Sequence, residues 1–581
     1  MNVMPDLFRH PNLSAQIPRS RNAVRDDKVF LRWLLLDKRE AVSKGQPFLM
    51  LHGDKKRGSR SIPLLVQVAI LPVCAKSKVV FKDYTPNQVM MLPPSLEELI
   101  MENHLVRVVN QVIDRINIDP LLKKFKGGGT SSYHPRMLLK VLVYGYLNNT
   151  YSSRRMESAL KENIHFMWLA GMNKPDHNTI NRFRSERLKD VLKTVFGQVV
   201  ELLVEAGHLS LKEVFTDGTK IEAQANRYTF VWGNAIKTNK SKMEEQLKEL
   251  WAYAERVAVE ELKDEAPESF APVSATQVKQ VIEKIDKALE GKAVSKKVKQ
   301  KLQYAKNNWP QNMKRYKHHE KLLGKRNSYS KTDIDATFMR MKEDHMRNGQ
   351  LKPAYNVQLS SHNQYIVNYS LHQKPTDTTT LKTHIDSFKK LYKQYPQVVV
   401  ADAGYGSEEN YQMLVNRKIE GYIKHNQFDR SLHRKHVDTF GSDNLIYDEE
   451  RDMMICPSGK PMKPIGETHR TTANGFKQKM IKYQATKCKG CPLLQQCHQQ
   501  KGNRVVAINH RLRKLKQQAD ERLKSEQGIA YRKRRPADVE PIFGNIKHNK
   551  NFKRFMLKGL DKVEIETGLL ALAHNLAKWA A

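Results

Sequence analysis

Cysteine is scarce in this chain, since only five of its 581 residues are cysteines. A number that is both small and odd excludes the paired disulfide framework of a small secreted domain. Long apolar runs are missing as well, because no stretch reaches the ~18 consecutive apolar residues that a membrane-spanning helix needs. The N-terminus also lacks a clear secretory signal. We therefore expect a cytoplasmic protein that does not enter a membrane.

Acidic residues are too few to balance the basic ones. Lysine and arginine number 100 against 61 aspartates and glutamates, which leaves a formal charge of +39. Solubility alone would require only a modest charge of mixed sign, whereas this excess costs self-repulsion and favours a polyanionic partner. The composition therefore predicts nucleic acid as the partner. A membrane surface is the weaker alternative, because no basic amphipathic stretch ends in a lipid-anchor motif.

Four of the five cysteines gather late in the chain, at Cys456, Cys488, Cys491 and Cys497. The middle two have the Cys-x2-Cys spacing, with Gly490 between them, that is typical of half of a tetrahedral zinc site. The outer two would complete the ligand set, and His498 is a substitute ligand. This pattern predicts a structural Zn²⁺ ion; the alternative is a group of ordinary reduced thiols.

The length and the 40% of apolar residues predict two to four structural units. Residues 1–80 show no sustained periodicity, and we interpret them as a basic extension, either a flexible arm or a stretch upstream of the true start. Residues 81–205 are expected to form a helical domain. Its helices should begin at Pro135, cover 153–162 and 164–169, and begin again after Asp176 as the N-cap.

The helix after Asp176 carries Arg182, Arg184 and Arg187. A series of short helices that ends in an arginine-bearing helix is typical of a helix-turn-helix DNA reader. We therefore predict that these three arginines bind DNA. The alternative is a helical lid or dimerisation unit whose basic face is only solvated.

Residues 206–581 carry the strand signals. Strands are expected at 209–216, 355–360, 365–369, 397–401 and 421–424, with helices at 378–395 and 408–417, an order that suits a mixed α/β sheet. A Lys/Glu-rich helical insertion is expected at 234–330, and its lysines from 287 to 325 could follow a phosphate backbone. A second insertion, 428–505, contains the cysteines. Helices are expected at 517–531, at 540–552 and, as an amphipathic terminal helix, at 560–579.

Three acidic residues suggest chemistry on phosphodiesters. Asp217 and Asp402 each follow a short apolar strand signal and precede a glycine by one or two residues, while Glu540 lies on an expected helix with Lys547 two turns later. Carboxylates are the ligands that Mg²⁺ prefers, and two such ions can activate the attacking oxygen and stabilise the leaving oxygen. A single aspartate at a strand end is more often a cap, so the prediction depends on the set of three.

Several blocks of the chain, in this order, resemble one family. They are Tyr133-His-Pro-Arg-Met137, Pro175-Asp-His-Asn-Thr179, Thr216-Asp-Gly-Thr-Lys220, Ala354-Tyr-Asn-Val-Gln358, Ala401-Asp-Ala-Gly-Tyr-Gly406, the cysteine segment and Glu540-Pro-Ile-Phe-Gly-Asn-Ile-Lys547. From about residue 79 to the C-terminus the chain resembles bacterial insertion-sequence DDE transposases, in the group with a Tyr-Arg-Glu-Lys signature around the third acid.

The resemblance implies an RNase H-like catalytic domain in which Asp217, Asp402 and Glu540 bind Mg²⁺ or Mn²⁺. Lys547 matches the signature lysine, and Tyr531 and Arg534 match its tyrosine and arginine. The group often has three residues between the arginine and the glutamate, whereas five separate Arg534 from Glu540 here. Arg535 therefore competes for the arginine role, and Asp538 has the shorter spacing but no lysine seven residues later.

The implied reaction is cleavage at the ends of a mobile DNA element, followed by attack of the freed 3′-hydroxyl on target double-stranded DNA. Cutting two ends together favours a homodimer on DNA. Two alternatives remain: a metal-dependent nuclease of the same fold that does not join strands, and an inactive, zinc-containing DNA-binding remnant.

Overall fold

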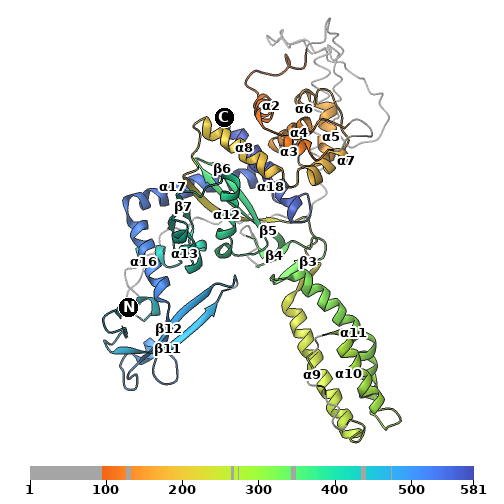
Figure 1. Ribbon diagram of the computed structural model, residues 1–581, viewed down its shortest axis with the longest axis vertical. Coiled ribbons are helices and arrows are strands. Elements are labelled where there is room, and N and C mark those ends of the chain that lie inside the picture. Colours follow the sequence, from red (N-terminus) through yellow and green to blue (C-terminus); the bar gives the residue numbers. More distant parts are fainter. Residues whose placement is uncertain are drawn as a thin grey trace, which may run out of the picture. The chain divides into compact units, whose positions relative to one another are not determined.

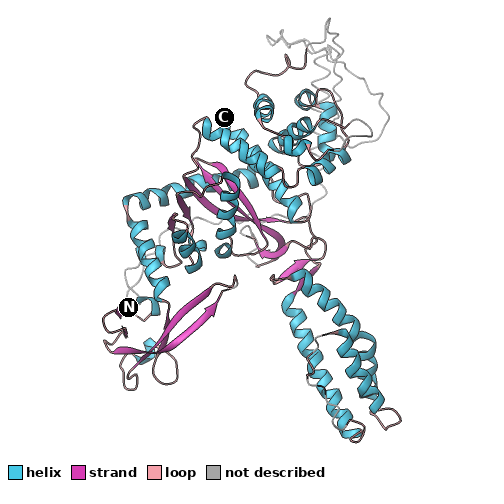
Figure 2. Cartoon of the chain, viewed as in Figure 1, coloured by secondary structure: helices cyan, strands magenta, loops and turns pink. Residues whose placement is uncertain are grey.

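The computed structural model describes residues 95–125, 132–262, 267, 269–271, 274–341, 349–433, 440–472 and 474–581. The predicted extension, residues 1–80, lies outside the described residues. Pro94–Ala581 form one compact unit of helices and strands (Figures 1 and 2). Among the described helices, none has the length and apolar character that crossing a membrane requires.

Short helices begin this unit, as predicted: α2 (Leu105–Arg115), α3 (Asp119–Leu122), α4 (Pro135–Leu147), α5 (Ser153–Glu162), α6 (Ile164–Leu169), α7 (His177–Arg182) and α8 (Leu192–Glu205). The expected start at Pro135 is confirmed, because proline lacks the N–H that a first-turn residue leaves unpaired. Asp176 is confirmed as the N-cap of α7, since its carboxylate accepts a hydrogen bond from the Thr179 amide at 2.9 Å. One turn of π-helix, η1 (Phe183–Arg187), follows α7.

A six-stranded sheet follows, with the strands β1 (Glu213–Glu222), β4 (Thr337–Arg340), β5 (Leu351–His362), β6 (Tyr365–His372), β7 (Val398–Ala401) and β8 (Glu420–Ile423). The strand order is β4-β5-β1-β7-β8, and β6 pairs with β5. β1 is antiparallel to β5 but parallel to β7, and β7 is parallel to β8. The predicted mixed α/β sheet is therefore confirmed.

Helices cover both faces of the sheet, because successive strand residues point to opposite sides. On one face, Phe215 of β1 and Val400 of β7 pack against Tyr531 and Val539 of α17 (Glu526–Gly544). The neighbouring Val214 and Val399 belong to a larger core that includes α8, α12 (Leu381–Tyr392) and α18 (Leu560–Trp579). The sheet thus holds α17 on one side and the N-terminal helices with α18 on the other.

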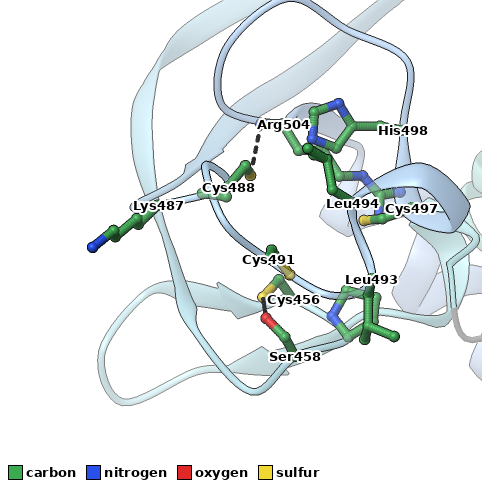
Figure 3. A pocket seen from close by; sticks show the side chains of 12 residues that line it. Cys456, Ser458, Lys487, Cys488, Cys491, Leu493, Leu494, Cys497, His498 and Arg504 are labelled. Carbon is green, nitrogen blue, oxygen red and sulfur yellow. Dashed lines mark hydrogen bonds between the residues drawn. The ribbon is translucent and has the colours of Figure 1, made fainter.

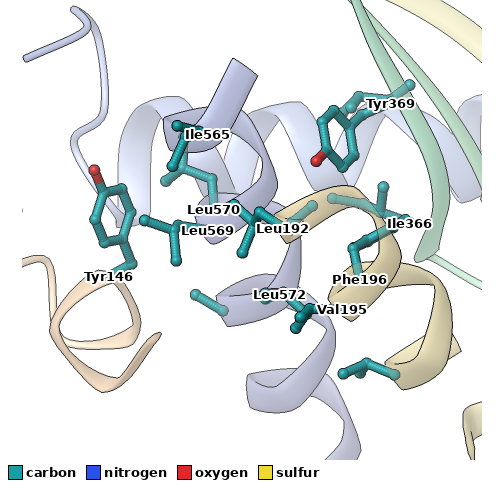
Figure 4. Packing of buried hydrophobic residues seen from close by; sticks show 14 of the residues in the cluster. Tyr146, Leu192, Val195, Phe196, Ile366, Tyr369, Ile565, Leu569, Leu570 and Leu572 are labelled. Carbon is teal, nitrogen blue, oxygen red and sulfur yellow. The ribbon is translucent and has the colours of Figure 1, made fainter. Parts of the chain in front are cut away.

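The terminal helix α18 has the predicted bounds but not the predicted amphipathic surface. Every residue from Ile565 to Leu576 is buried, including polar Glu566, His574 and Asn575. Figure 4 shows why: α18 packs against α8 and lies beside Tyr369 of β6. Gly568 permits this contact, since a Cβ there would lie 2.5 Å from the Tyr369 hydroxyl. A helix enclosed on all sides can carry polar residues only where partners satisfy them.

Two insertions extend from this framework. The first consists of α9 (Gly233–Val257), α10 (Ala275–Ala288) and α11 (Lys296–Leu323), which share their own apolar core and are joined to the framework at β2 (Phe230–Trp232) and β3 (Ser328–Ser330). The second contains a five-stranded antiparallel sheet in the order β13-β12-β11-β10-β9. Its long hairpin is β11 (Pro461–Thr471) and β12 (Lys477–Ala485), and the other strands are β9 (Ile446–Asp448), β10 (Met453–Ile455) and β13 (Val505–Ile508). The domain limits drawn from the sequence stay predictions.

The helices near the third acid differ from the prediction. α16 (His510–Lys524) ends at Lys524, with Ser525 as the cap between the helices, and α17 then continues without interruption through Glu540. The predicted helix over 517–531 and the predicted new start at Glu540 were both wrong, since α17 is one continuous helix that contains Pro536 and Pro541. Ser525 is the break, since its hydroxyl accepts a hydrogen bond from the Gly528 amide at 3.1 Å.

Candidate active site

Two aspartates meet where the parallel pairing of β1 and β7 ends. Thr216 pairs with Ala401, so Asp217 and Asp402 both follow the last paired position. Asp217 is not at a strand end as predicted, because β1 continues to Glu222 along β5. Asp402 does follow its strand, and its carboxylate accepts a hydrogen bond from the Ala403 amide at 2.7 Å. The register of two parallel strands thus places the two carboxylates on neighbouring chains.

Gly218 gives this part of the sheet its shape. A Cβ at Gly218 would lie 2.2 Å from the Gln358 amide nitrogen and 2.7 Å from an Asp377 carboxylate oxygen. Gln358 and Asn356 each donate to that carboxylate at 2.8 Å. A larger residue at position 218 would therefore displace the polar network that supports the backbone beside Asp217.

Glu540 and Lys547 line the same open pocket as the two aspartates. α17 crosses this edge of the sheet, and Glu540, Phe543, Gly544 and Lys547 recur at three- and four-residue intervals along one helical face. Thr219, Arg535 and His548 complete the lining. The structure therefore brings together Asp217, Asp402, Glu540 and Lys547, which the sequence singled out separately. Thr219, Phe543 and His548 were missed, since nothing in their spacing marks them.

Arg535, and not Arg534, is the arginine of this pocket. One Arg535 Nη lies 3.2 Å from Asp217 Oδ2 and the other 3.6 Å from Asp402 Oδ2. Arg534 instead donates to Asn363 at 2.7 Å and lies 3.5 Å from Glu213. Tyr531 also donates to Glu213, at 2.7 Å. Tyr531 and Arg534 therefore lie outside the pocket, where they fasten α17 to the start of β1.

Asp538, the alternative third acid, faces away from the pocket. It lies two positions before Glu540 on the helix, which corresponds to a rotation of roughly 200°. Its carboxylate accepts hydrogen bonds from the Ser361 hydroxyl at 2.7 Å and the Gln364 amide at 3.2 Å. Asp538 is 3% exposed. Its position thus favours Glu540 as the third acid.

The π-helical turn that carries Lys547 is anchored from behind. Lys547 lies in η5 (Asn545–Asn549), directly after α17. Asn545 donates to His574 of α18 at 3.0 Å, and the second ring nitrogen of His574 donates to the Gln364 carbonyl at 2.9 Å. Burial lowers the pKa of His574 to about 4, so its ring is neutral at neutral pH. A neutral ring can accept from Asn545 while donating to Gln364, which fixes η5 relative to β5 and β6.

The four late cysteines line one pocket, as Figure 3 shows, but their arrangement does not support the predicted zinc ion. Arg504 donates from its guanidinium to Cys497 Sγ at 3.1 Å and from its backbone amide to Cys488 Sγ at 3.3 Å. Burial alone would raise the pKa of Cys456, but hydrogen bonds from Ser458 and the Lys460 amide outweigh it and lower that pKa. In the described ranges, no three His, Cys, Asp or Glu side chains converge as metal ligands.

One of the predicted DNA-binding arginines is a core residue. Arg184 is 3% exposed and donates to the Tyr151 carbonyl at 2.7 Å and to the Tyr146 hydroxyl at 3.2 Å. It therefore has no free surface for DNA, and that part of the prediction was wrong. Arg187 is half-buried, donates to the Lys124 carbonyl and lies over Phe125. Only Arg182 is exposed.

Comparison with known families agrees with this architecture at both ends of the unit. Residues 94–186 match the family described as Transposase domain (DUF772), which covers α2 to α7. Residues 455–580 match the family described as Transposase DDE domain, which includes α17 with Glu540. No curated protein and no solved structure gives a significant match. These two matches, in this order along the chain, support the resemblance to insertion-sequence DDE transposases.

Proposed function

We propose that this chain cleaves DNA at the ends of an insertion sequence and joins the freed 3′-hydroxyl to target DNA. The observation that carries the proposal is the convergence of Asp217, Asp402 and Glu540, from β1, β7 and α17, on one pocket. The order of parallel and antiparallel strands is compatible with the RNase H-like fold that the family resemblance implies.

The donor chemistry of the pocket fits Mg²⁺ or Mn²⁺, because carboxylate oxygens are the hard ligands that these ions prefer. Asp217, Asp402 and Glu540 would hold the metal. The bound ions would supply charge neutralisation at the scissile phosphate. Lys547 lies two helical turns from Glu540 along the same lining, where its ammonium group would contact a phosphate of the bound strand.

The proposed chemistry is two displacements at phosphorus. In the first, a water oxygen forms a bond to the phosphorus at the element end; the bond to the 3′-oxygen breaks, and that oxygen leaves as a 3′-hydroxyl. In the second, this hydroxyl attacks a target phosphodiester, so one P–O bond is exchanged for another and no external energy source is needed. Because two ends must be cut and joined together, we propose that two copies of the chain act on one DNA complex.

A second surface fits the DNA partner. α11 contains nine lysines and arginines but one acidic residue, Glu320, which pairs with Lys240 at 2.8 Å. By contrast, α9 and α10 carry charges of both signs. Lys314, Lys317 and Lys321 are exposed on the C-terminal half of α11. The helix from residue 296 to 321 is about 38 Å long, which matches about eleven base pairs of backbone.

We expect the triple variant Lys314→Gln/Lys317→Gln/Lys321→Gln to bind DNA at least roughly tenfold more weakly at moderate salt. Each lost phosphate contact should also reduce the slope of log Kd against log salt by about 0.9. Fluorescence anisotropy on a labelled duplex over a salt series measures both quantities. The matched control is Lys237→Gln/Lys242→Gln/Lys248→Gln on α9, which removes the same charge beside Glu244 and Glu245. Equal effects of the two triples would reject α11 as a DNA contact.

A cleavage and strand-transfer assay tests the proposed reaction. It would use labelled DNA with the ends of the element that encodes this chain, with Mg²⁺ or with EDTA. Cleaved and joined products that require Mg²⁺ would support a transposase. Cleavage without joining would favour the nuclease alternative, and binding without cleavage would favour an inactive remnant.

A further inference from the structure

We propose that Arg535 is the counter-ion of the aspartate pair in the metal-free protein, and that it leaves this pair when a divalent metal binds. Released from the aspartates, the guanidinium then donates to a phosphate of the bound DNA. This inference rests on the proposed function, because it concerns the same pocket. It assigns Arg535 a role that alternates between holding the carboxylates and holding the substrate.

The geometry of Arg535 is that of a bridge. Its two terminal nitrogens lie 3.2 Å from Asp217 Oδ2 and 3.6 Å from Asp402 Oδ2, so one planar group spans carboxylates from two strands. The Arg535 and Asp217 side chains are only 14% and 13% exposed, whereas Asp402 is 47% exposed. The two carboxylates carry like charges, and the one guanidinium that contacts both compensates their repulsion.

The position of Arg535 is also one that a metal ion would need. A divalent ion bound by both aspartates must contact carboxylate oxygens on the side where they approach each other, and the guanidinium now occupies that side. Two cations cannot share these oxygens at contact distance without strong repulsion. Metal binding and the Arg535 bridge are therefore mutually exclusive.

Arg535 is free to make this exchange, whereas its neighbour is not. Within the described part of the chain, the two aspartates are its sole hydrogen-bond and ion-pair partners. Arg534 is held by Asn363, Glu213 and Asp538, and its guanidinium lies over Phe215. Arg535 also lines the open pocket with Lys547. A displaced guanidinium there can remain near the site and pair with the phosphate anion, which it binds through two parallel hydrogen bonds.

The test separates metal affinity from catalysis. Arg535→Gln removes the competing cation, so we expect Mn²⁺ to bind about three- to tenfold more tightly, as expected for the loss of a competing ion pair. DNA cleavage by the same variant should become slower, because the phosphate contact is lost. Isothermal calorimetry with MnCl₂ alone measures the first effect, and the cleavage assay the second. A merely structural role would lower both.

The matched control is Arg534→Gln, which removes an equal charge one residue away and should leave Mn²⁺ affinity unchanged. Unchanged or weaker Mn²⁺ binding by a folded Arg535→Gln variant would overturn the inference. If that variant does not fold, Arg535→Lys replaces it: lysine keeps the charge but reaches one aspartate, so Mn²⁺ should still bind more tightly than to the wild type. Asp217→Asn shows which proposal has failed. If Asp217→Asn retains full Mn²⁺ affinity, the proposed metal site is wrong. If Asp217→Asn loses Mn²⁺ affinity while Arg535→Gln binds Mn²⁺ as tightly as the wild type, only this inference fails.

Discussion

Asp217→Asn and Glu540→Gln are each expected to reduce DNA cleavage on the order of a thousandfold or more. Loss of a residue that only orients a metal ligand costs about 10- to 100-fold, and loss of the ligand itself should exceed that. Both substitutions keep the size of the side chain and remove its negative charge, so the fold should persist. Single-turnover cleavage of an element-end duplex in Mg²⁺ measures the effect, and the melting temperature checks the fold.

The control for Glu540 is Asp538→Asn on the same helix. Asp538 accepts hydrogen bonds from Ser361 and Gln364 on the far side of α17, so its replacement should lower thermal stability and leave cleavage largely intact below the melting temperature. The opposite pattern, with Asp538→Asn inactive and Glu540→Gln active, would reassign the third acid. Activity in all three variants would remove this pocket from the reaction.

The sequence identified the acids because each lies in a local pattern that can be read without tertiary information. Asp402 follows an apolar strand, and Glu540 and Lys547 share a helical face at seven-residue spacing. Their convergence was not readable, since it depends on the register of β1 against β7. Asp217 was placed at a strand end because its apolar run stops there, whereas pairing with β5 extends β1 by five residues.

The errors have a shared cause, which is that burial is decided by partners distant in sequence. Arg184 reads as a DNA contact because it lies between two other arginines, yet Tyr146 and Glu566 lie beside it in the core. Arg534 and Arg535 are adjacent, and only the angle of α17 over the sheet decides that Arg535 faces the aspartates.

Glu566→Leu is expected to destabilise the protein by about 3–5 kcal/mol, because it removes a buried carboxylate that accepts three hydrogen bonds and lies near the buried Arg184. Glu566 is fully buried in α18 and accepts hydrogen bonds from the Tyr146 hydroxyl at 2.9 Å and from the Met556 and Leu557 amides at 2.9 and 2.8 Å. Leucine would leave those amides unpaired and Arg184 buried without a counter-charge. Urea unfolding measures the loss. Glu564→Leu is the matched control, because Glu564 is exposed on the same helix and should change stability by less than about 0.5 kcal/mol.

Arg184→Met should lower the stability of the protein by an amount that depends on pH. Burial raises the pKa of Glu566, and Arg184 opposes that rise. Without Arg184, the folded state should hold a proton on Glu566 to a higher pH than the unfolded chain does. A folded-state pKa above the unfolded value gives stability at low pH that is lost as pH rises, so the deficit against wild type should be smaller at pH 5 than at pH 8. An equal deficit at both pH values would show that Arg184 acts by packing alone.

The double variant Glu566→Leu/Arg184→Met should lose less stability than the sum of the two single variants, because the second change removes the charge that the first leaves without a counter-charge.

A change in the packing of α18 should also affect the pocket. α18 carries His574, which holds Asn545 at the start of the turn that bears Lys547. A shift of α18 would therefore move a pocket residue that Glu566 does not touch. Strict additivity, with cleavage unchanged in every folded variant, would show that the N-terminal helices and the pocket are independent.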